Sequence, residues 1–153
     1  MSNIVVQIAK NFERIEANQT RIEKLVEAVF SRFNLSKATV SIALIDDAEI
    51  CKANKQFLNS NYPTDVISFD LSDSVTDSAK LFELLINAER AIREAALRGH
   101  SSEAELSLYI IHGLLHNLGF SDSTQNEAKQ MHDIEDEILQ QQGFGLVYNT
   151  QEY

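Results

Sequence analysis

Residues 112–122 have the sequence HGLLHNLGFSD and follow a helix-prone run, residues 101–111, that is mostly apolar on one face. Two histidines four residues apart on a helix, here His112 and His116, lie one turn apart on the same face, about 5–6 Å between Cβ atoms. One metal ion can bridge that span through two ring nitrogens. The simpler alternative is a pair of half-buried histidines satisfied by hydrogen bonds. The stretch therefore predicts a central helix over about 102–118 with both histidines on one side.

The residues after the helix add a third metal-ligand candidate. Gly119 offers a helix C-cap that needs no Cβ in the left-handed region. A chain that turns back there brings Asp122 to the open side of both imidazoles, which leaves a fourth position for water, as in a catalytic zinc site. A carboxylate also suits harder ions, so Mn²⁺ or Ni²⁺ could compete with Zn²⁺. Asp122 has a rival role as the cap of the next helix, through the backbone N–H groups of Thr124 or Gln125.

The residue after the first histidine excludes one class of enzyme. A zinc peptidase of the H-E-x-x-H type carries a glutamate there as general base. This chain has Gly113 at that position. A metalloprotease is therefore not expected.

Bulk composition indicates one globular domain, which we expect to span residues 1–145, with a tail over 146–153. The chain has 153 residues, of which 44% are hydrophobic and 24% charged. Its net charge of −10 argues against a chain-wide cationic surface for nucleic acid, and no DNA is expected as a partner. A single cysteine and the lack of a long apolar run favour a cytoplasmic location without membrane contact.

Hydrophobic periodicity predicts alternating strands and helices, and so an α+β fold with a small mixed sheet of about four strands and about five helices. Strands are expected at 4–9, 38–45, 66–71 and 81–86. Helices are expected at 18–33, 48–58, 87–99, 102–118 and about 123–142. The strand at 81–86 follows a polar loop, 72–78, and is expected to be an antiparallel edge. Ser102 is expected to cap the central helix, with Glu105 completing a capping box.

Several other charged residues are expected to be solvent-facing. His100 lies in a turn and is expected to be exposed. His132 on the last helix could reach the cleft behind the metal ligands, but a solvated histidine is the preferred interpretation. The acidic run Asp133, Glu135, Asp136 and Glu137 is expected to form a solvated helix face. Arg90, Arg93 and Arg98 form the densest basic cluster, and they are the best phosphate contacts if RNA binds.

A second informative stretch is residues 62–69, YPTDVISF, in which a rigid turn at Pro63 leads directly into an apolar strand. Together with N-x-x-F at 54–57, Glu105 and H-G-x-L-H-x-x-G-F at 112–120, it resembles the YbeY family of bacterial rRNA maturation factors. The resemblance covers most of the chain.

The resemblance implies a metal-dependent, single-strand-specific endoribonuclease that acts in rRNA maturation and ribosome quality control. It implies one Zn²⁺ on the H-G-x-L-H helix facing a cleft, and rRNA, ribosomes or ribosome-associated proteins as partners. The metal ligands expected are His112, His116 and Asp122, and no side chain is assigned as catalytic. The substrate-binding candidates are Asn54, Thr64, Asp65, Ser68 and Arg90.

Three departures from the family pattern fall near the expected site. Ser121 and Asp122 stand where the family usually has Asp-His, whose histidine is its third metal ligand. Leu58 stands where the family usually has an arginine proposed to contact phosphate. Phe82-Glu83 stands where the family usually has Gly-Asp ahead of the Ile-x-Ile core of the fourth strand, which is Leu84-Leu85-Ile86 in this chain. These departures motivate an alternative: a non-catalytic protein that keeps the fold and binds the ribosome or an assembly factor.

Overall fold

The structure, a computed structural model, describes residues 3–73, 79–145 and 147. Most of the expected polar loop at 72–78 lies outside these residues, and so does the expected tail at 146–153 apart from Val147. That one residue is fully buried in the hydrophobic core.

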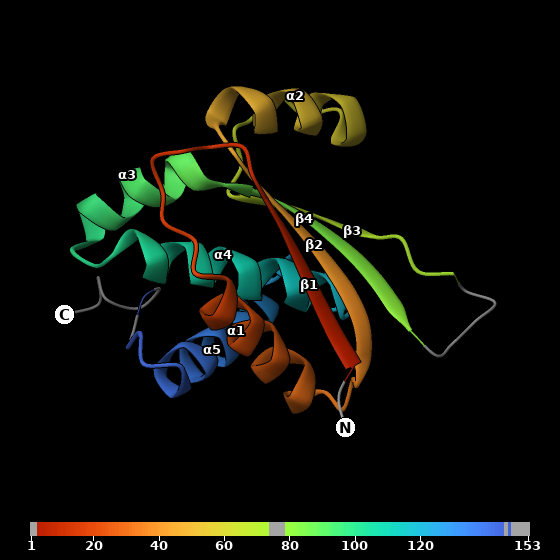
Figure 1. The fold of residues 1–153 in the computed structure, drawn as a ribbon. Helices are drawn as coiled ribbons and strands as arrows, with labels where there is room; N and C mark the ends of the chain where they lie inside the picture. Colours follow the sequence, from red (N-terminus) through yellow and green to blue (C-terminus); the bar gives the residue numbers. More distant parts are fainter. Residues whose placement is uncertain (1–2, 74–78, 146, 148–153) are drawn as a thin grey trace.

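The described chain folds as four strands and five helices in the order β1-α1-β2-α2-β3-β4-α3-α4-α5 (Figure 1). The strands are β1 (Asn3–Lys10), β2 (Lys37–Ile45), β3 (Val66–Asp70) and β4 (Lys80–Asn87). The helices are α1 (Gln19–Arg32), α2 (Asp47–Leu58), α3 (Ala88–Arg98), α4 (Ser102–Asn117) and α5 (Gln125–Gln141). The predicted α+β class and the number and order of the elements are confirmed.

The sheet is mixed, with strand order β1-β2-β4-β3. β1 pairs with β2, and β2 with β4, in parallel, whereas β3 pairs with β4 antiparallel, with Ser68 opposite Leu84. The prediction that the strand at 81–86 is an edge is therefore wrong. β4 is internal because it pairs with β2 on one side and β3 on the other, and the two edges are β1 and the shorter β3.

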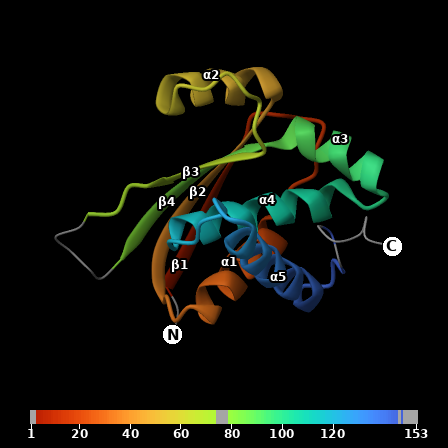
Figure 2. The same ribbon diagram turned by 180° about the vertical axis from the view of Figure 1, so that it is seen from behind.

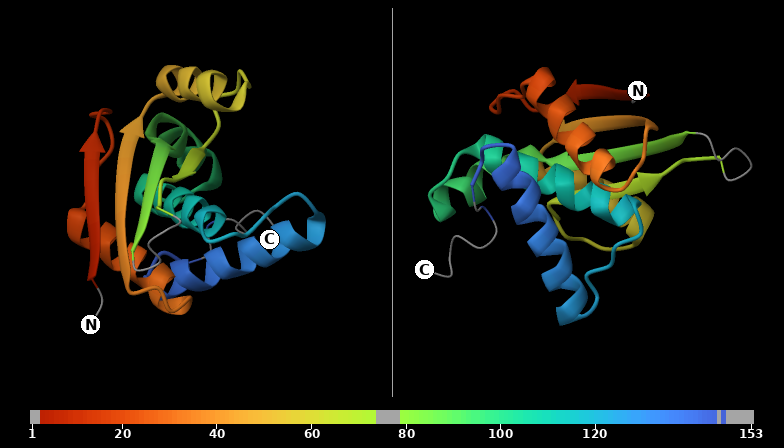
Figure 3. Two further views of the ribbon diagram at one scale, coloured as in Figure 1. Left: turned by 90° about the vertical axis from the view of Figure 1, so that its right-hand side faces the viewer. Right: turned by 90° about the horizontal axis from the view of Figure 1, so that it is seen from below.

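Helices cover the two faces of the sheet unequally. Figure 1 and the reverse view in Figure 2 show α1, α4 and α5 on one face and α2 alone on the other. The main core lies between the sheet and the three helices, and it includes Phe30, Phe82 and Ile110. A smaller cluster of Ile45, Ile50 and Ile67 lies under α2. α4 consequently lies between β3 and β4 on one side and α5 on the other, as Figure 3 shows.

The start of α4 differs from the prediction. Ser101, not Ser102, is the N-cap, and its hydroxyl accepts from the backbone N–H of Ala104. Glu105 takes no part in a capping box, because its side chain is 1% exposed and accepts a hydrogen bond from the His100 ring at 2.5 Å. His100 is thereby drawn inward to 12% side-chain exposure, so its predicted solvation is wrong.

Among the described residues, no helix combines the length and the apolar character that crossing a membrane requires.

Candidate metal centre

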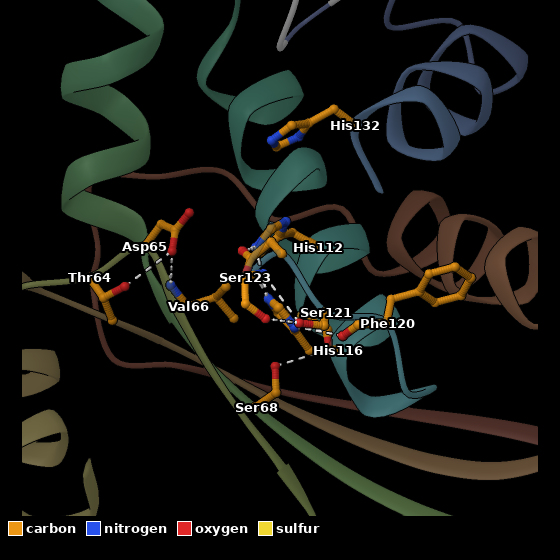
Figure 4. A network of polar contacts seen from close by, with 12 residues as sticks. Thr64, Asp65, Val66, Ser68, His112, His116, Phe120, Ser121, Ser123 and His132 are labelled. Carbon is orange, nitrogen blue, oxygen red and sulfur yellow. Dashed lines mark hydrogen bonds and ion pairs between the residues drawn. The ribbon is translucent and has the colours of Figure 1, made fainter. Parts of the chain in front are cut away.

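Gly113 sets how closely α4 approaches the sheet. A Cβ built on it would lie 2.9 Å from side-chain atoms of both Leu84 and Val66 and 3.0 Å from the Ser68 hydroxyl. The Ser68 hydroxyl donates to the Gly113 carbonyl at 2.9 Å, which ties β3 to the helix (Figure 4). The glycine between the two histidines is therefore needed for packing, and the histidine face of α4 has a fixed place beside β3.

The turn after α4 brings Asp122 back to the histidines. α4 ends at Asn117, and Gly119 has φ of +101°, which favours glycine, as predicted. The Nε2 atoms of His112 and His116 are 3.0 Å apart, and the nearer Asp122 oxygen, Oδ2, lies 3.5 Å from each. Donors bound to one tetrahedral zinc at about 2.0–2.1 Å would be roughly 3.3–3.4 Å apart. The triangle thus has nearly the dimensions of one face of such a coordination shell.

Both histidines have their second ring nitrogen held by an acceptor. His112 Nδ1 lies 2.5 Å from Glu135 Oε2. His116 Nδ1 lies 3.1 Å from the Phe120 carbonyl (Figure 4). A carboxylate and a carbonyl can only accept, so each Nδ1 donates. In the neutral rings both Nε2 atoms then carry lone pairs that face one another at 3.0 Å. Such an arrangement is repulsive. A metal ion that takes both lone pairs would relieve the repulsion, as would a proton shared between the two nitrogens in a hydrogen bond.

Behind His112 lies a second cluster, formed with His132 and Glu135. The Glu135 side chain is fully buried, and its Oε1 accepts from His132 Nδ1 at 2.7 Å. The His132 ring stacks near that of His112 at an interplanar angle of 15°. Burial lowers the pKa of His112, but the hydrogen bond and charge of Glu135 outweigh it, so the net pKa is raised. Burial raises the pKa of Glu135, and its bonds to the two histidines reverse this and lower it.

The acidic run on α5 is therefore only half solvated, contrary to prediction. Glu135 and Asp136 are buried, whereas Asp133 and Glu137 are exposed. His132, also expected to be solvated, is bound to Glu135 and has 19% side-chain exposure.

Donor spacing separates the two clusters chemically. Both could supply three ligand atoms lying within 4.8 Å of one another. The inner contacts of 2.5 and 2.7 Å are hydrogen-bond lengths, too short for neighbouring ligands on one ion. The outer cluster of His112, His116 and Asp122 has the wider spacing that an ion requires, and it is partly open to solvent, with Asp122 47% exposed.

Comparison with known proteins agrees with this geometry. The family model described as endoribonuclease YbeY matches residues 7–143. The chain belongs to the endoribonuclease YbeY family. The protein of that name from Heliobacterium modesticaldum is 30% identical over 149 residues, covering 89% of this chain and 90% of its own length. The Acholeplasma laidlawii protein is 34% identical over 128 residues, covering 84% and 91%. The Bacillus licheniformis protein is 30% identical over 152 residues, covering 92% and 96%.

A solved structure supports the fold independently. The solution structure of a Thermotoga maritima protein matches with a TM-score of 0.57 at 22% identity, covering 90% of this chain and 91% of that one. The family resemblance expected from the two motifs is thus confirmed. Membership in a family of endoribonucleases favours the enzyme over the non-catalytic binding protein.

The rival role for Asp122 is filled by another residue. Thr124 is the N-cap of α5, and its hydroxyl accepts from the Glu127 N–H at 3.1 Å. Ser121, at the first departure from the YbeY family pattern, accepts from the Ser123 N–H and lies 2.5 Å from its hydroxyl. These short-range bonds shape the turn and leave the Asp122 carboxylate directed at the histidines.

The five substrate-binding candidates do not form one group. Asn54 is buried, and its amide donates to the Tyr62 carbonyl at 2.9 Å, bracing the loop before β3. Ser68 braces α4 as described above. Thr64 donates to Asp65, whose Oδ1 also accepts from the Val66 N–H (Figure 4). Asp65 and Arg90 line one small cavity beside His112.

The basic cluster on α3 is engaged in ion pairs. Arg93 contacts Asp47 at 2.9 Å, and the Arg93 hydrogen bond lowers the pKa of that carboxyl despite partial burial. Arg98 lies 3.7 Å from Glu105, and Arg90 lies 3.9 Å from Glu94. Of the three, Arg90 and Arg98 line the cavity beside His112.

Sequence reasoning missed Glu135 as a partner of the site, and it favoured a solvated His132 over one that reaches the site. A signal was present: Met131, Ile134 and Ile138 mark the buried face of α5, and Glu135 lies beside them at helical spacing. A carboxylate on a buried helix face is nearly always paired, and a histidine already suspected of binding metal is a suitable partner.

Proposed function

We propose that this protein is a metal-dependent, single-strand-specific endoribonuclease that acts in rRNA maturation and ribosome quality control. We assign the ion to His112, His116 and Asp122, and propose Zn²⁺ as its identity and the cytoplasm as its location. The observation that carries the assignment is the triangle of Nε2, Nε2 and Oδ2 atoms, with edges of 3.0, 3.5 and 3.5 Å. Family membership supplies the RNA-cleaving activity.

The chain's own residues prepare these donors. Glu135 and the Phe120 carbonyl hold the Nδ1 protons, which leaves both Nε2 lone pairs directed at one point. Gly119 supplies the turn that returns Asp122 to the same point. A divalent cation bound there would polarise a phosphoryl oxygen and acidify a coordinated water.

Asp122 tunes the site relative to one with three histidines. Its carboxylate is anionic, so the site carries one positive charge fewer than with a neutral third imidazole. A less electrophilic ion acidifies its water less. We therefore propose that cleavage near pH 7 is slower than in relatives with a third histidine, and that Leu58 adds weaker RNA binding.

Metal analysis of the purified protein, paired with cleavage of single-stranded RNA, tests the proposal. We expect about one divalent ion per chain and cleavage that is lost with chelator and restored by Zn²⁺. His116→Ala is the control that reveals a contaminating nuclease, because beyond the contacts within the metal triangle it removes only the hydrogen bond to the Phe120 carbonyl and the ring contact with His112. Cleavage that survives chelation or this substitution would reject the proposed enzyme.

A further inference from the structure

A second polar site adjoins the metal cluster. It is a cavity of about 80 Å³ that shares His112 with the outer cluster and is lined by side chains from α3, α4 and α5. Arg90, Glu94 and Arg98 come from α3, and Tyr109 comes from α4. The metal chemistry uses none of these four side chains.

The cavity contains hydrogen-bond donors that lack partners. Tyr109 is 3% exposed, and burial and the nearby Glu105 carboxylate raise the pKa of its hydroxyl, which has no partner at hydrogen-bond geometry among the described residues. The Arg98 Nε and Nη1 atoms are likewise buried without one, because the Glu105 oxygen at 3.7 Å is too far for a hydrogen bond. Buried polar groups are nearly always paired, so these donors point to a bound group that offers acceptors.

The charge of the lining decides which acceptor fits. Four carboxylates line the cavity, those of Asp65, Glu94, Glu105 and Glu135, against two guanidinium groups and the imidazoles of His112 and His132, which both bond to Glu135. That excess of negative charge disfavours a phosphate. Glu105 and Glu135 already accept from histidines, whereas the partly exposed Glu94 and Asp65 retain lone pairs for further donors. The cavity therefore suits an uncharged group that carries acceptors and donors side by side.

We propose that this cavity is a nucleobase subsite, which takes the polar edge of one base of the RNA. Nucleobases present adjacent acceptors and donors, arginine pairs with acceptors such as those of guanine, and carboxylates accept from amino groups. Single-stranded RNA can turn its bases outward for such contacts. Arg90 and Glu94, with 37% and 26% side-chain exposure, form the mouth through which a base edge enters.

The inference rests on the proposed function, which supplies single-stranded RNA as the ligand. It adds that the protein prefers certain bases at one position of that RNA. Because His112 belongs to both sites, the bound base belongs to a nucleotide next to the one whose phosphate meets the metal cluster. The cavity has room for about two or three waters at roughly 30 Å³ each, so only the edge of the base enters.

Binding measured without cleavage tests the subsite. The four ribonucleosides and inorganic phosphate are titrated separately into the full-length, metal-loaded protein, and the Tyr109 ring and Arg98 Nε–H resonances are followed by NMR. We expect at least one nucleoside to shift both resonances and to bind several-fold more tightly than the weakest of the four. Tyr109→Phe should weaken that nucleoside about 3- to 10-fold, the value of one hydrogen bond.

Controls separate the subsite from a general loss of structure. Tyr62→Phe removes the same hydroxyl from a residue that is 73% exposed and outside the cavity, and it should leave binding unchanged. Arg98→Gln provides a second test if Tyr109→Phe does not fold. Phosphate binding more tightly than every nucleoside, equal binding of all four, or unchanged binding in the folded variant would each overturn the subsite.

The same titration distinguishes this inference from the proposed function. A protein that binds a nucleoside in the cavity but cleaves no RNA would reject the nuclease assignment and keep the subsite. A protein that cleaves RNA but binds no nucleoside in the cavity would reject the subsite and keep the nuclease assignment.

Discussion

The outer and inner clusters use the same kinds of side chain for different ends. Outside, His112, His116 and Asp122 place three donor atoms 3.0–3.5 Å apart, with Asp122 nearly half exposed. Inside, Glu135 bridges His112 and His132 at 2.5 and 2.7 Å and is fully buried. The comparison teaches that donor spacing, and not residue type, separates a cation site from a hydrogen-bond network. His112 belongs to both clusters, so the inner cluster orients a histidine of the proposed metal site.

The two clusters should differ most in how much metal affinity is lost when one histidine of each is replaced. His116→Ala should weaken metal binding by about 100-fold or more, because a ligand accounts for roughly a quarter of the binding free energy of a four-ligand zinc site. His132→Phe keeps a ring beside His112 and should change metal affinity by less than about 10-fold. Competition with a fluorescent zinc chelator measures both. Equal losses in the two variants would show that the inner histidine is itself a ligand.

Glu135→Gln tests whether the inner cluster acts on the outer one. His112 and His132 bond to different oxygens of Glu135, and glutamine replaces one of them with an NH2 group that cannot accept, so metal affinity at pH 8 should fall about 10- to 100-fold. Glu135 also raises the pKa of His112, which makes protons compete with the metal from a higher pH. The midpoint of the pH dependence of metal affinity should therefore lie at a lower pH in the variant. A variant with unchanged affinity and an unchanged midpoint would confine Glu135 to a packing role.

Asp122→Asn tests whether Asp122 is a metal ligand, because it removes the negative charge of the side chain without changing its size. We expect about 10-fold weaker metal binding and unchanged stability, because Thr124 caps α5 and Asp122 does not. Asp122→His should instead raise metal affinity and nuclease activity. Metal titration and thermal unfolding of both variants check this, and full metal affinity in the Asn variant would reject Asp122 as a ligand.

Leu58→Arg gives the smallest expected effect, because it lies outside both clusters. Leu58 is 58% exposed at the end of α2, where a cation adds one phosphate contact. RNA binding should strengthen, with its logarithmic salt dependence steeper by about one unit. Metal affinity, measured as the control, should stay constant. A constant salt slope would place this position off the RNA path.

Local patterns predicted the elements and the outer cluster well. His112, His116, Gly119 and Asp122 fall within eleven consecutive residues, so helical spacing and one turn suffice to bring them together. The inner cluster joins α4 to α5 across 23 residues, and its formation depends on how the two helices pack. The prediction that β4 lies at an edge failed for a related reason. Its pairing with β2 depends on how the chain crosses over through α2 and β3, which hydrophobic periodicity does not encode.

Buried charge was the other source of error. His100, Glu105 and Glu135 were expected to be solvated or to cap a helix, because isolated charges favour water. Each is buried against a partner that lies five or more residues away. Pairing of this kind becomes visible only when the helix faces are placed together.

The most direct test of the central claim is an anomalous-scattering map from a crystal of the zinc-loaded protein. The account predicts one strong peak about 2.0–2.2 Å from His112 Nε2, His116 Nε2 and an Asp122 oxygen, with Glu135 still bonded to His112 Nδ1. A peak among His112 Nδ1, His132 and Glu135, or no peak at the outer cluster, would contradict it.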